Sequence, residues 1–176
     1  MTPPRYDRPD GSEHDPYYAK YIEGVPDGDV LQALERQDAD FQQMMKGVPE
    51  AKGDFAYAPG KWTLKEVLGH IADTERVFCY RTLRMARGDA TPLPGFDENA
   101  WVPESGAKQR TLSDLLAELS AIRAATLALL KNIPAEAPLR RGTANNKGIT
   151  VRALVWVTAG HALHHQRLIR ERYLAP

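Results

Sequence analysis

Four long segments of this chain place apolar residues three or four positions apart, a spacing that is typical of amphipathic helices. The second segment has the clearest start, because Thr63 and Glu66 form a capping box and Trp62 can pack onto Val67. Helices of this length extend over roughly 30–40 Å and can align side by side in one bundle. The predicted helices cover residues 29–47, 63–88, 111–132 and 150–174.

The connection between the second and third predicted helices, residues 89–110, is long enough to cross a whole bundle. These two helices can therefore run parallel to each other. The connection also carries Phe96, Trp101 and the acidic pair Asp97 and Glu98. A loop this long in a compact domain is more often functional than idle.

Residues 1–26 form a different kind of segment, with five of the 13 prolines and tyrosines at positions 17, 18 and 21. We expect an irregular N-terminal arm whose aromatic side chains pack on the bundle. Almost no segment has the alternating pattern of a strand. The sequence therefore predicts one all-α domain over residues 1–176, a four-helix bundle with a long crossover after the second helix.

Charge and composition exclude several classes of function. Lys and Arg number 23, as do Asp and Glu, and this balance argues against binding nucleic acid by its phosphates. The longest apolar run, residues 153–157, is far too short to span a membrane, and the first residues lack a signal-peptide pattern. Cys79 is the only cysteine, so neither an intrachain disulfide nor a cysteine-rich metal module is expected. We expect a cytoplasmic protein with no nucleic-acid or membrane partner.

Three of the five histidines lie in the run GHALHHQR of the last predicted helix. At 100° per residue, His161 and His165 fall in the middle of its inward apolar stripe, and His164 falls at the edge. Imidazoles four residues apart on a helix can bind one ion. No Asp or Glu lies beside this pair to hold it as a buried structural pair. We therefore favour metal ligation, although the Glu of a metalloprotease helix is missing.

A third ligand must come from another helix, and His70 of the second one points toward a neighbouring helix. Asp73, one turn later, and His164 are candidates for holding a ring N–H or a proton near the metal, although Asp73 can equally be a surface carboxylate. Cys79 lies on the opposite side of the helix from His70. Three protein ligands with an open position are typical of catalytic metal sites. We favour zinc or nickel as the metal, with iron and manganese as alternatives. Imidazole ligands alone do not select among these metals.

The chain resembles the DinB/YfiT-like family in three stretches that, with the arm, span nearly its whole length. They are residues 57–89, which contain WTLKEVLGH, residues 93–101, LPGFDENAW, and residues 149–173, which contain GHALHHQR. The resemblance implies an up-down-down-up bundle, a divalent metal on His70, His161 and His165, and frequent dimers. Members of known chemistry are S-transferases or an isomerase that depend on thiols such as bacillithiol or mycothiol.

Three functions follow from these patterns. The first is a metal-dependent thiol S-transferase with a small-molecule thiol and an electrophile as partners, in which the metal favours the thiolate. The loop 89–110 and Arg167 and Arg170 are candidates for binding anionic groups of the thiol. The second is a metallohydrolase that activates water, with Asp73 or His164 as the base. The third is a non-enzymatic metal-binding stress-response protein. In each case we expect a homodimer.

Overall fold

The computed structural model describes residues 4–175 and contains four long helices. A single π-helical turn, Ile169–Tyr173, extends the last of them. Thr63 caps α3 through the capping box expected from the sequence, and Thr111 and Thr150 cap α5 and α6. The long helices are α2 (Val30–Met45), α3 (Leu64–Ala86), α5 (Leu112–Lys131) and α6 (Val151–Leu168).

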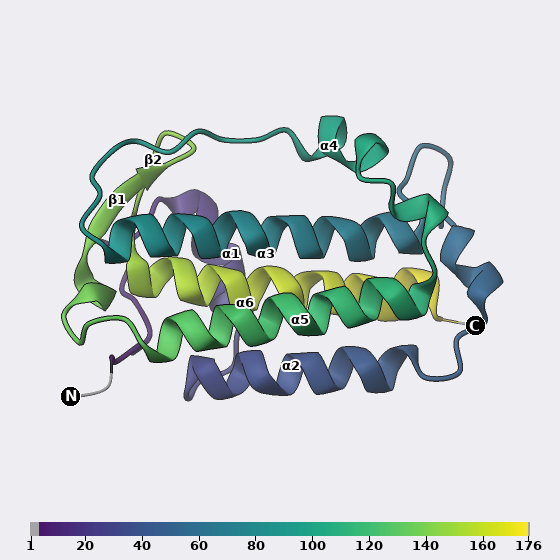
Figure 1. The fold of residues 1–176 in the computed structure, drawn as a ribbon, viewed down its shortest axis with the longest axis horizontal. Coiled ribbons are helices and arrows are strands. Elements are labelled where there is room, and N and C mark those ends of the chain that lie inside the picture. The colour runs from purple at the N-terminus through teal and green to yellow at the C-terminus, as the bar shows by residue number, and fades with distance from the viewer. Residues whose placement is uncertain (1–3, 176) are drawn as a thin grey trace.

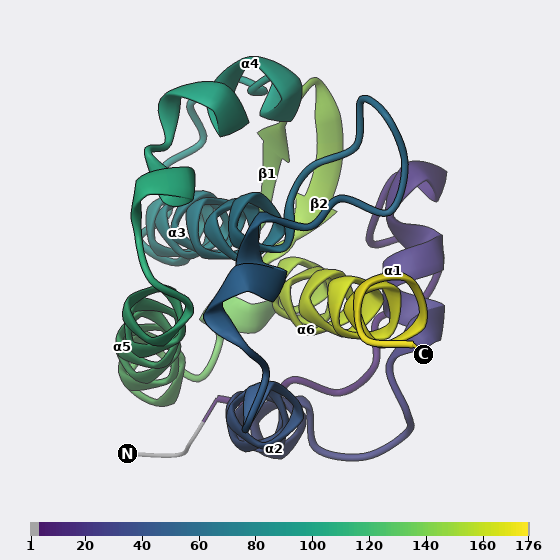
Figure 2. The same cartoon turned by 90° about the vertical axis from the view of Figure 1, so that its right-hand side faces the viewer.

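The bundle has the predicted up-down-down-up order. Helices α2 and α6 run in one direction and α3 and α5 in the other, and the chain between α3 and α5 returns along the length of the bundle (Figure 1). Viewed end on, α5 and α6 each pack against both α2 and α3 (Figure 2). Within the described part of the chain, no helix is both long and apolar enough to cross a membrane.

The crossover is more structured than a plain loop. It contains the short helix α4 (Glu98–Glu104), capped by the side chain of Asp97, and a 3-10 turn at Ala107–Gln109. Near its start, Leu93 donates its N–H to the carbonyl oxygen of Thr143 at 2.9 Å. This contact ties the crossover to the segment that precedes α6.

That preceding segment corrects the expectation of almost no strand. Strands β1 (Arg141–Ala144) and β2 (Lys147–Thr150) pair in an antiparallel hairpin. Asn145 and Asn146 form its two-residue turn with φ angles of 53° and 58°. Asparagine tolerates this left-handed region, and two-residue hairpins of this kind require it.

The N-terminal arm is also partly helical, where the sequence predicted an irregular segment. A 3-10 turn, Pro16–Tyr18, leads into α1 (Ala19–Gly24), which packs along α6 (Figure 2). At the contact, a Cβ on Gly160 would overlap the backbone carbonyl of Tyr21, so only glycine lets α1 approach this closely. Residues 1–3 of the predicted arm lie outside the described residues.

The buried core consists of two apolar clusters separated by a polar layer. One cluster surrounds Trp156 and the second surrounds Leu68. Between them, the buried Arg123 of α5 pairs with Glu75 of α3 at 2.7–2.8 Å and donates to the carbonyl oxygen of Leu34 at 2.6 Å. The three predicted ligands occupy the same layer, on the side of α3 that faces α6.

Candidate metal centre and its cavity

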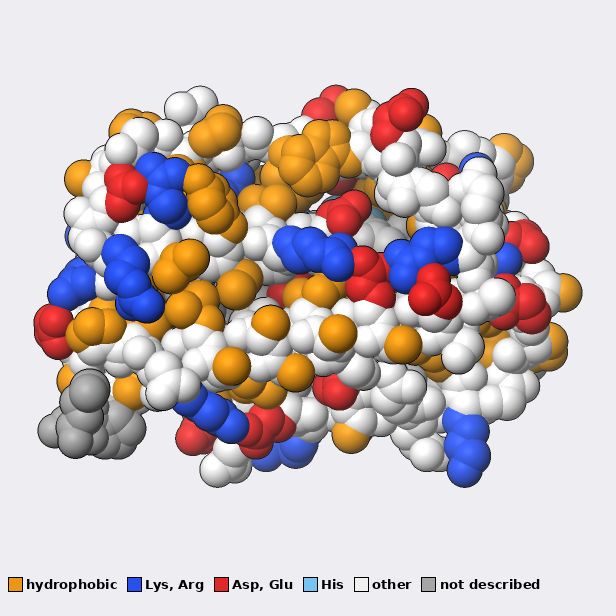
Figure 3. Space-filling model, in the orientation of Figure 1, with side chains coloured by type: hydrophobic (Ala, Val, Ile, Leu, Met, Phe, Trp, Pro, Cys, Tyr) orange, Lys and Arg blue, Asp and Glu red, His pale blue; other side chains and the backbone are white. Residues whose placement is uncertain are grey.

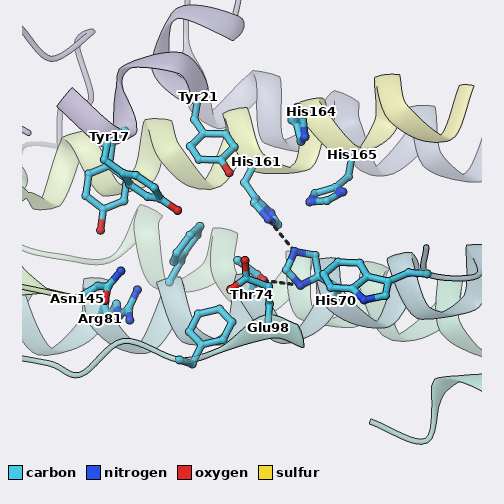
Figure 4. A pocket seen from close by; sticks show the side chains of 14 residues that line it. Tyr17, Tyr21, His70, Thr74, Arg81, Glu98, Asn145, His161, His164 and His165 are labelled. Atoms are coloured by element: carbon cyan, nitrogen blue, oxygen red, sulfur yellow. Dashed lines mark hydrogen bonds between the residues drawn. The ribbon is translucent and has the colours of Figure 1, made fainter. Parts of the chain in front are cut away.

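The structure brings the three predicted ligands together. His70 lies in the first half of α3, and His161 and His165 lie on successive turns of α6; all three are buried. The Nε2 atoms of His70 and His161 are 3.2 Å apart (Figure 4), and the ring centroids of His161 and His165 are 4.5 Å apart. One ring nitrogen from each histidine lies within 4.8 Å of the other two.

These distances fit a shared divalent ion. Two nitrogens about 2.0–2.1 Å from a tetrahedral ion lie roughly 3.3–3.4 Å apart, close to the separation of His70 and His161. His165 also leaves its buried Nδ1 without a hydrogen-bond partner among the residues that the structure describes. A buried polar atom without a partner is costly, so a ligand that orders this ring would offset that cost.

Burial keeps the three imidazoles neutral, which is the form that binds metal. It lowers the pKa of His70 from 6.5 to about 4 and that of His165 to about 3. It also lowers the pKa of His161 well below its ordinary value, and the neighbouring histidines add to this effect. All three rings are therefore unprotonated at neutral pH.

Three neighbouring side chains orient the rings of His70 and His161. The Thr74 hydroxyl, one turn after His70, lies 3.5 Å from His70 Nδ1. The Trp62 ring packs against His70 with centroids 4.8 Å apart, and the Tyr21 ring of α1 packs against His161 at 5.8 Å. Contacts within the protein therefore orient the rings of His70 and His161 without a ligand.

The histidines form one wall of an open cavity of about 200 Å³. The arm, the crossover and the hairpin turn supply the other walls, which are mainly aromatic (Figure 4). The remaining lining residues are Tyr17, Tyr18, Tyr21, Trp62, Thr74, Phe78, Arg81, Phe96, Glu98, Asn145 and His164.

Glu98 is the acidic residue of this cavity that sequence reasoning did not assign. It is the first residue of α4, is exposed to solvent, and raises the pKa of His70 slightly against the larger effect of burial. The acidic pair in a long crossover was visible in the sequence. Its position beside His70 follows from the path of the crossover, which no periodicity encodes.

Asp73 does not join the histidines. It forms an ion pair with Arg76 at 3.5 Å, and Arg76 also pairs with Glu118 of α5. These charges belong to the outer face of α3 and α5, where acidic and basic side chains intermingle (Figure 3). The residue one turn from His70 that reaches the ring is Thr74, because His70 faces α6 whereas Asp73 faces α5.

The two remaining histidines, together with Cys79 and Arg167, lie at the rim or outside the cavity. His164 lines the cavity edge, is exposed, and packs against Tyr21 with centroids 6.0 Å apart. His14 pairs with Ile149 of the hairpin, and Cys79 lies in a separate groove between α3 and α5. Arg167 donates to the carbonyl oxygen of Gly24 and is not part of the cavity lining.

The comparison with known families agrees with this architecture. The DinB superfamily matches residues 33–169, most of the chain. The chain belongs to the DinB superfamily. The family resemblance seen in the sequence is thereby confirmed, and the DinB bundle is the frame that carries the histidine cluster.

Two known proteins are similar to this DinB chain. YfiT of Bacillus subtilis, a proposed metal-dependent hydrolase, is 26% identical over 145 residues, which is 80% of each chain. Its solved structure, described as an unusual four-helix bundle topology, matches with a TM-score of 0.74 at 24% identity, covering 93% of this chain and 89% of YfiT. A Streptococcus pneumoniae protein matches with a TM-score of 0.64 at 13% identity, covering 89% and 98% of the two chains. The two structures show that the fold is shared.

Proposed function

We propose that this protein is a metal-dependent enzyme whose divalent ion is held by His70, His161 and His165. The observation that carries the proposal is the convergence of three buried, neutral imidazoles on the wall of an open cavity. Within residues 4–175, no fourth His, Cys, Asp or Glu joins the cluster. An open face of this kind favours an enzyme over a non-enzymatic metal-binding protein, and zinc or nickel suits an all-imidazole site.

We propose hydrolysis as the reaction that the cavity supports best. A divalent ion bound here would polarise a carbonyl or phosphoryl group and lower the pKa of a ligated nucleophile. Glu98 then takes the role of general base, because its carboxylate is solvated and lies at the cavity wall beside His70. Of the two bases considered from the sequence, Asp73 is engaged with Arg76, and His164 lies exposed at the cavity edge. The similarity to YfiT supports this proposal.

Thiol S-transfer is the second candidate. The aromatic walls formed by Tyr18, Phe78 and Phe96 suit an apolar electrophile. Cys79 lies in a different groove, so the attacking sulfur would have to come from a small-molecule thiol such as bacillithiol. The homodimer and the cytoplasmic location also stay predictions.

One experiment separates these functions. Purified protein is loaded with zinc or nickel and incubated with 4-nitrophenyl acetate without thiol, and separately with monobromobimane and bacillithiol. Hydrolysis predicts ester turnover that His161→Ala abolishes and Glu98→Gln lowers about 100-fold, the usual contribution of a general base. S-transfer predicts thiol consumption that needs His161 but tolerates Glu98→Gln. Cys79→Ser is the control and should change neither rate. Two rates that are indifferent to His161→Ala would contradict an enzymatic role for the metal in either reaction.

A further inference from the structure

Arg81 is a buried guanidinium that belongs to the cavity wall and has no acidic partner. Its side chain is about as inaccessible as the core, at 4% exposure, yet it lines the same cavity as the histidines. Across residues 4–175, no carboxylate lies within ion-pair distance of it. Burying an unpaired charge is costly, so a buried charge of this kind usually binds a counter-ion.

The helix geometry places Arg81 and His70 at opposite ends of one cavity. They are eleven residues apart on α3, which is close to three full turns, so both lie on the same face and their Cα atoms are about 16 Å apart along the axis. Phe78 lies between them and also lines the cavity. Figure 4 shows Arg81 beside Asn145 at one end and the three histidines at the other.

The guanidinium of Arg81 uses only part of its hydrogen-bond donors within the protein. One of its terminal nitrogens donates to the carbonyl oxygen of Pro94 at 2.7 Å, which also fixes the side chain against the crossover. A guanidinium carries several further N–H groups and matches a carboxylate or a phosphate in a two-point contact. The Phe78 and Phe96 rings lie 6.0 and 5.9 Å from its central carbon. These rings and the low exposure of Arg81 reduce its contact with water, and an ionic contact is stronger where water is excluded.

The charges around the cavity have the matching polarity. Lys20 lies between the rings of Tyr17 and Tyr21 at the rim, with ammonium-to-centroid distances of 5.5 and 4.9 Å. Lys147 lies over the Tyr17 ring at 5.0 Å and is paired with Asp15. The acidic Glu98 lies at the histidine end. The positive charges of Lys20 and Arg81 attract an anionic group into the cavity, and the negative charge of Glu98 makes the Arg81 end the more favourable place for it.

We infer that Arg81 binds a carboxylate or phosphate of the substrate, so that this enzyme acts on an anionic molecule with an apolar or aromatic body. The inference rests on the proposed function only for the position of the reacting group, which would lie at the histidines. The anion contact itself belongs to Arg81 and does not need the metal.

The test is an NMR titration with phenylacetate, the neutral phenylacetamide of the same shape, and phenyl phosphate. It is run on chelated protein, where no metal can bind the anion, and again on zinc-loaded protein. Wild-type protein should prefer an anion over phenylacetamide by roughly ten- to one-hundredfold, as expected for a buried hydrogen-bonded charge. The affinities of the two anions show which of them Arg81 prefers, with the larger charge of the phosphate taken into account.

Arg81→Gln should lose this preference and Arg81→Lys should keep part of it. Arg87→Gln, which removes the same charge from an exposed position just after α3, should change nothing. Since Arg81 also holds Pro94, the Nε–H signal of Arg81 in unmodified protein is followed as a second measurement. It should shift with the anion and not with phenylacetamide. Equal binding of the anions and the amide to wild-type protein, or an unchanged preference in Arg81→Gln, would overturn the inference. If the metal proposal failed, the measurements on chelated protein would still test the anion contact of Arg81, because no metal takes part in them.

Discussion

The Nε2 atoms of His70 and His161 lie 3.2 Å apart although 91 residues separate them in the chain. Neighbouring helices α3 and α6 bring them together, and both backbones are regular at these positions. Rings carried on rigid helices need little rearrangement to share an ion, and such sites are more precise than sites on loops. The site is therefore preorganised, and its binding properties should depend on which rings face inward.

The first prediction concerns the ligand set. Replacement of His70, His161 or His165 by Ala should each lower metal occupancy strongly, because each removes one of three converging nitrogens. His164→Ala should have a smaller effect, since that ring lies exposed at the cavity edge. Metal content is measured by elemental analysis of the purified variants.

His14→Ala is the matched control for this series, because His14 lies on the hairpin side of the arm and outside the cluster. It should leave metal content unchanged. If His164→Ala removed the metal while His165→Ala retained it, the assignment of ligands on α6 would be wrong.

The second prediction concerns metal removal. An ion that binds only the folded protein stabilises it by about 2.7 kcal/mol at one hundred times its dissociation constant. For a domain of this size, each kcal/mol shifts the melting temperature by roughly 2–4 °C. A chelator should therefore lower the melting temperature by several degrees, and the bundle should still fold because its two apolar clusters are independent of the metal.

Melting curves of metal-loaded protein with and without chelator check this expectation, with His161→Ala as a variant that should be insensitive to chelator. Identical curves for wild-type protein would mean that the ion is not held by the buried cluster. Complete unfolding by the chelator would make the site structural and would favour a non-enzymatic role.

The helices and the inward histidines could be predicted because both follow from a repeating angle. On α6, 100° per residue places His161 and His165 on the buried stripe and His164 at its edge, as found. The same angle is not sufficient for α3, which has two buried neighbours. It left Asp73 and Thr74 on either side of His70, and only the packing of α3 between α5 and α6 decides that Thr74 reaches the ring.

The remaining walls of the cavity depend on long-range contacts that no local pattern records. Glu98 and Phe96 reach the site because the crossover is tied to the hairpin through Leu93. The hairpin itself has only four residues per strand, too few for a clear alternation, although the Asn145–Asn146 turn was a usable signal. The eleven-residue spacing of Arg81 from His70 is visible in the sequence and indicates that the two side chains share one face of α3.

The third prediction concerns acid. In chelated protein, burial lowers the pKa of His70 to about 4 and that of His165 to about 3, whereas unfolded histidine titrates near 6.5. Between these values the unfolded chain binds protons that the folded chain does not, so the free energy of unfolding falls as the pH falls from about 6.5 toward 4. Each histidine contributes up to about 1.4 kcal/mol per pH unit in this window.

Urea midpoints of chelated protein across this pH range provide the measurement. His165→Gln removes one titrating group and should flatten the pH dependence, whereas His14→Gln should not. A wild-type midpoint that stayed constant from pH 6.5 to pH 4 would contradict the buried, neutral state of these rings.

The fourth prediction tests how α1 is seated against the metal site. Replacing glycine by alanine inside a helix ordinarily stabilises a protein by up to about 1 kcal/mol. Gly160→Ala should instead destabilise by about 1–3 kcal/mol, because the new Cβ overlaps the carbonyl group of Tyr21 and backbone cannot move aside as a flexible side chain can. Since Tyr21 packs on His161, the same variant should weaken metal binding.

Gly24→Ala is the control: its Cβ would meet only Arg167, at 3.9 Å, and it should be neutral or stabilising. Denaturant unfolding and metal titration of the two variants decide the matter, and a stabilised Gly160→Ala with unchanged metal affinity would show that α1 can leave α6 without cost to the site.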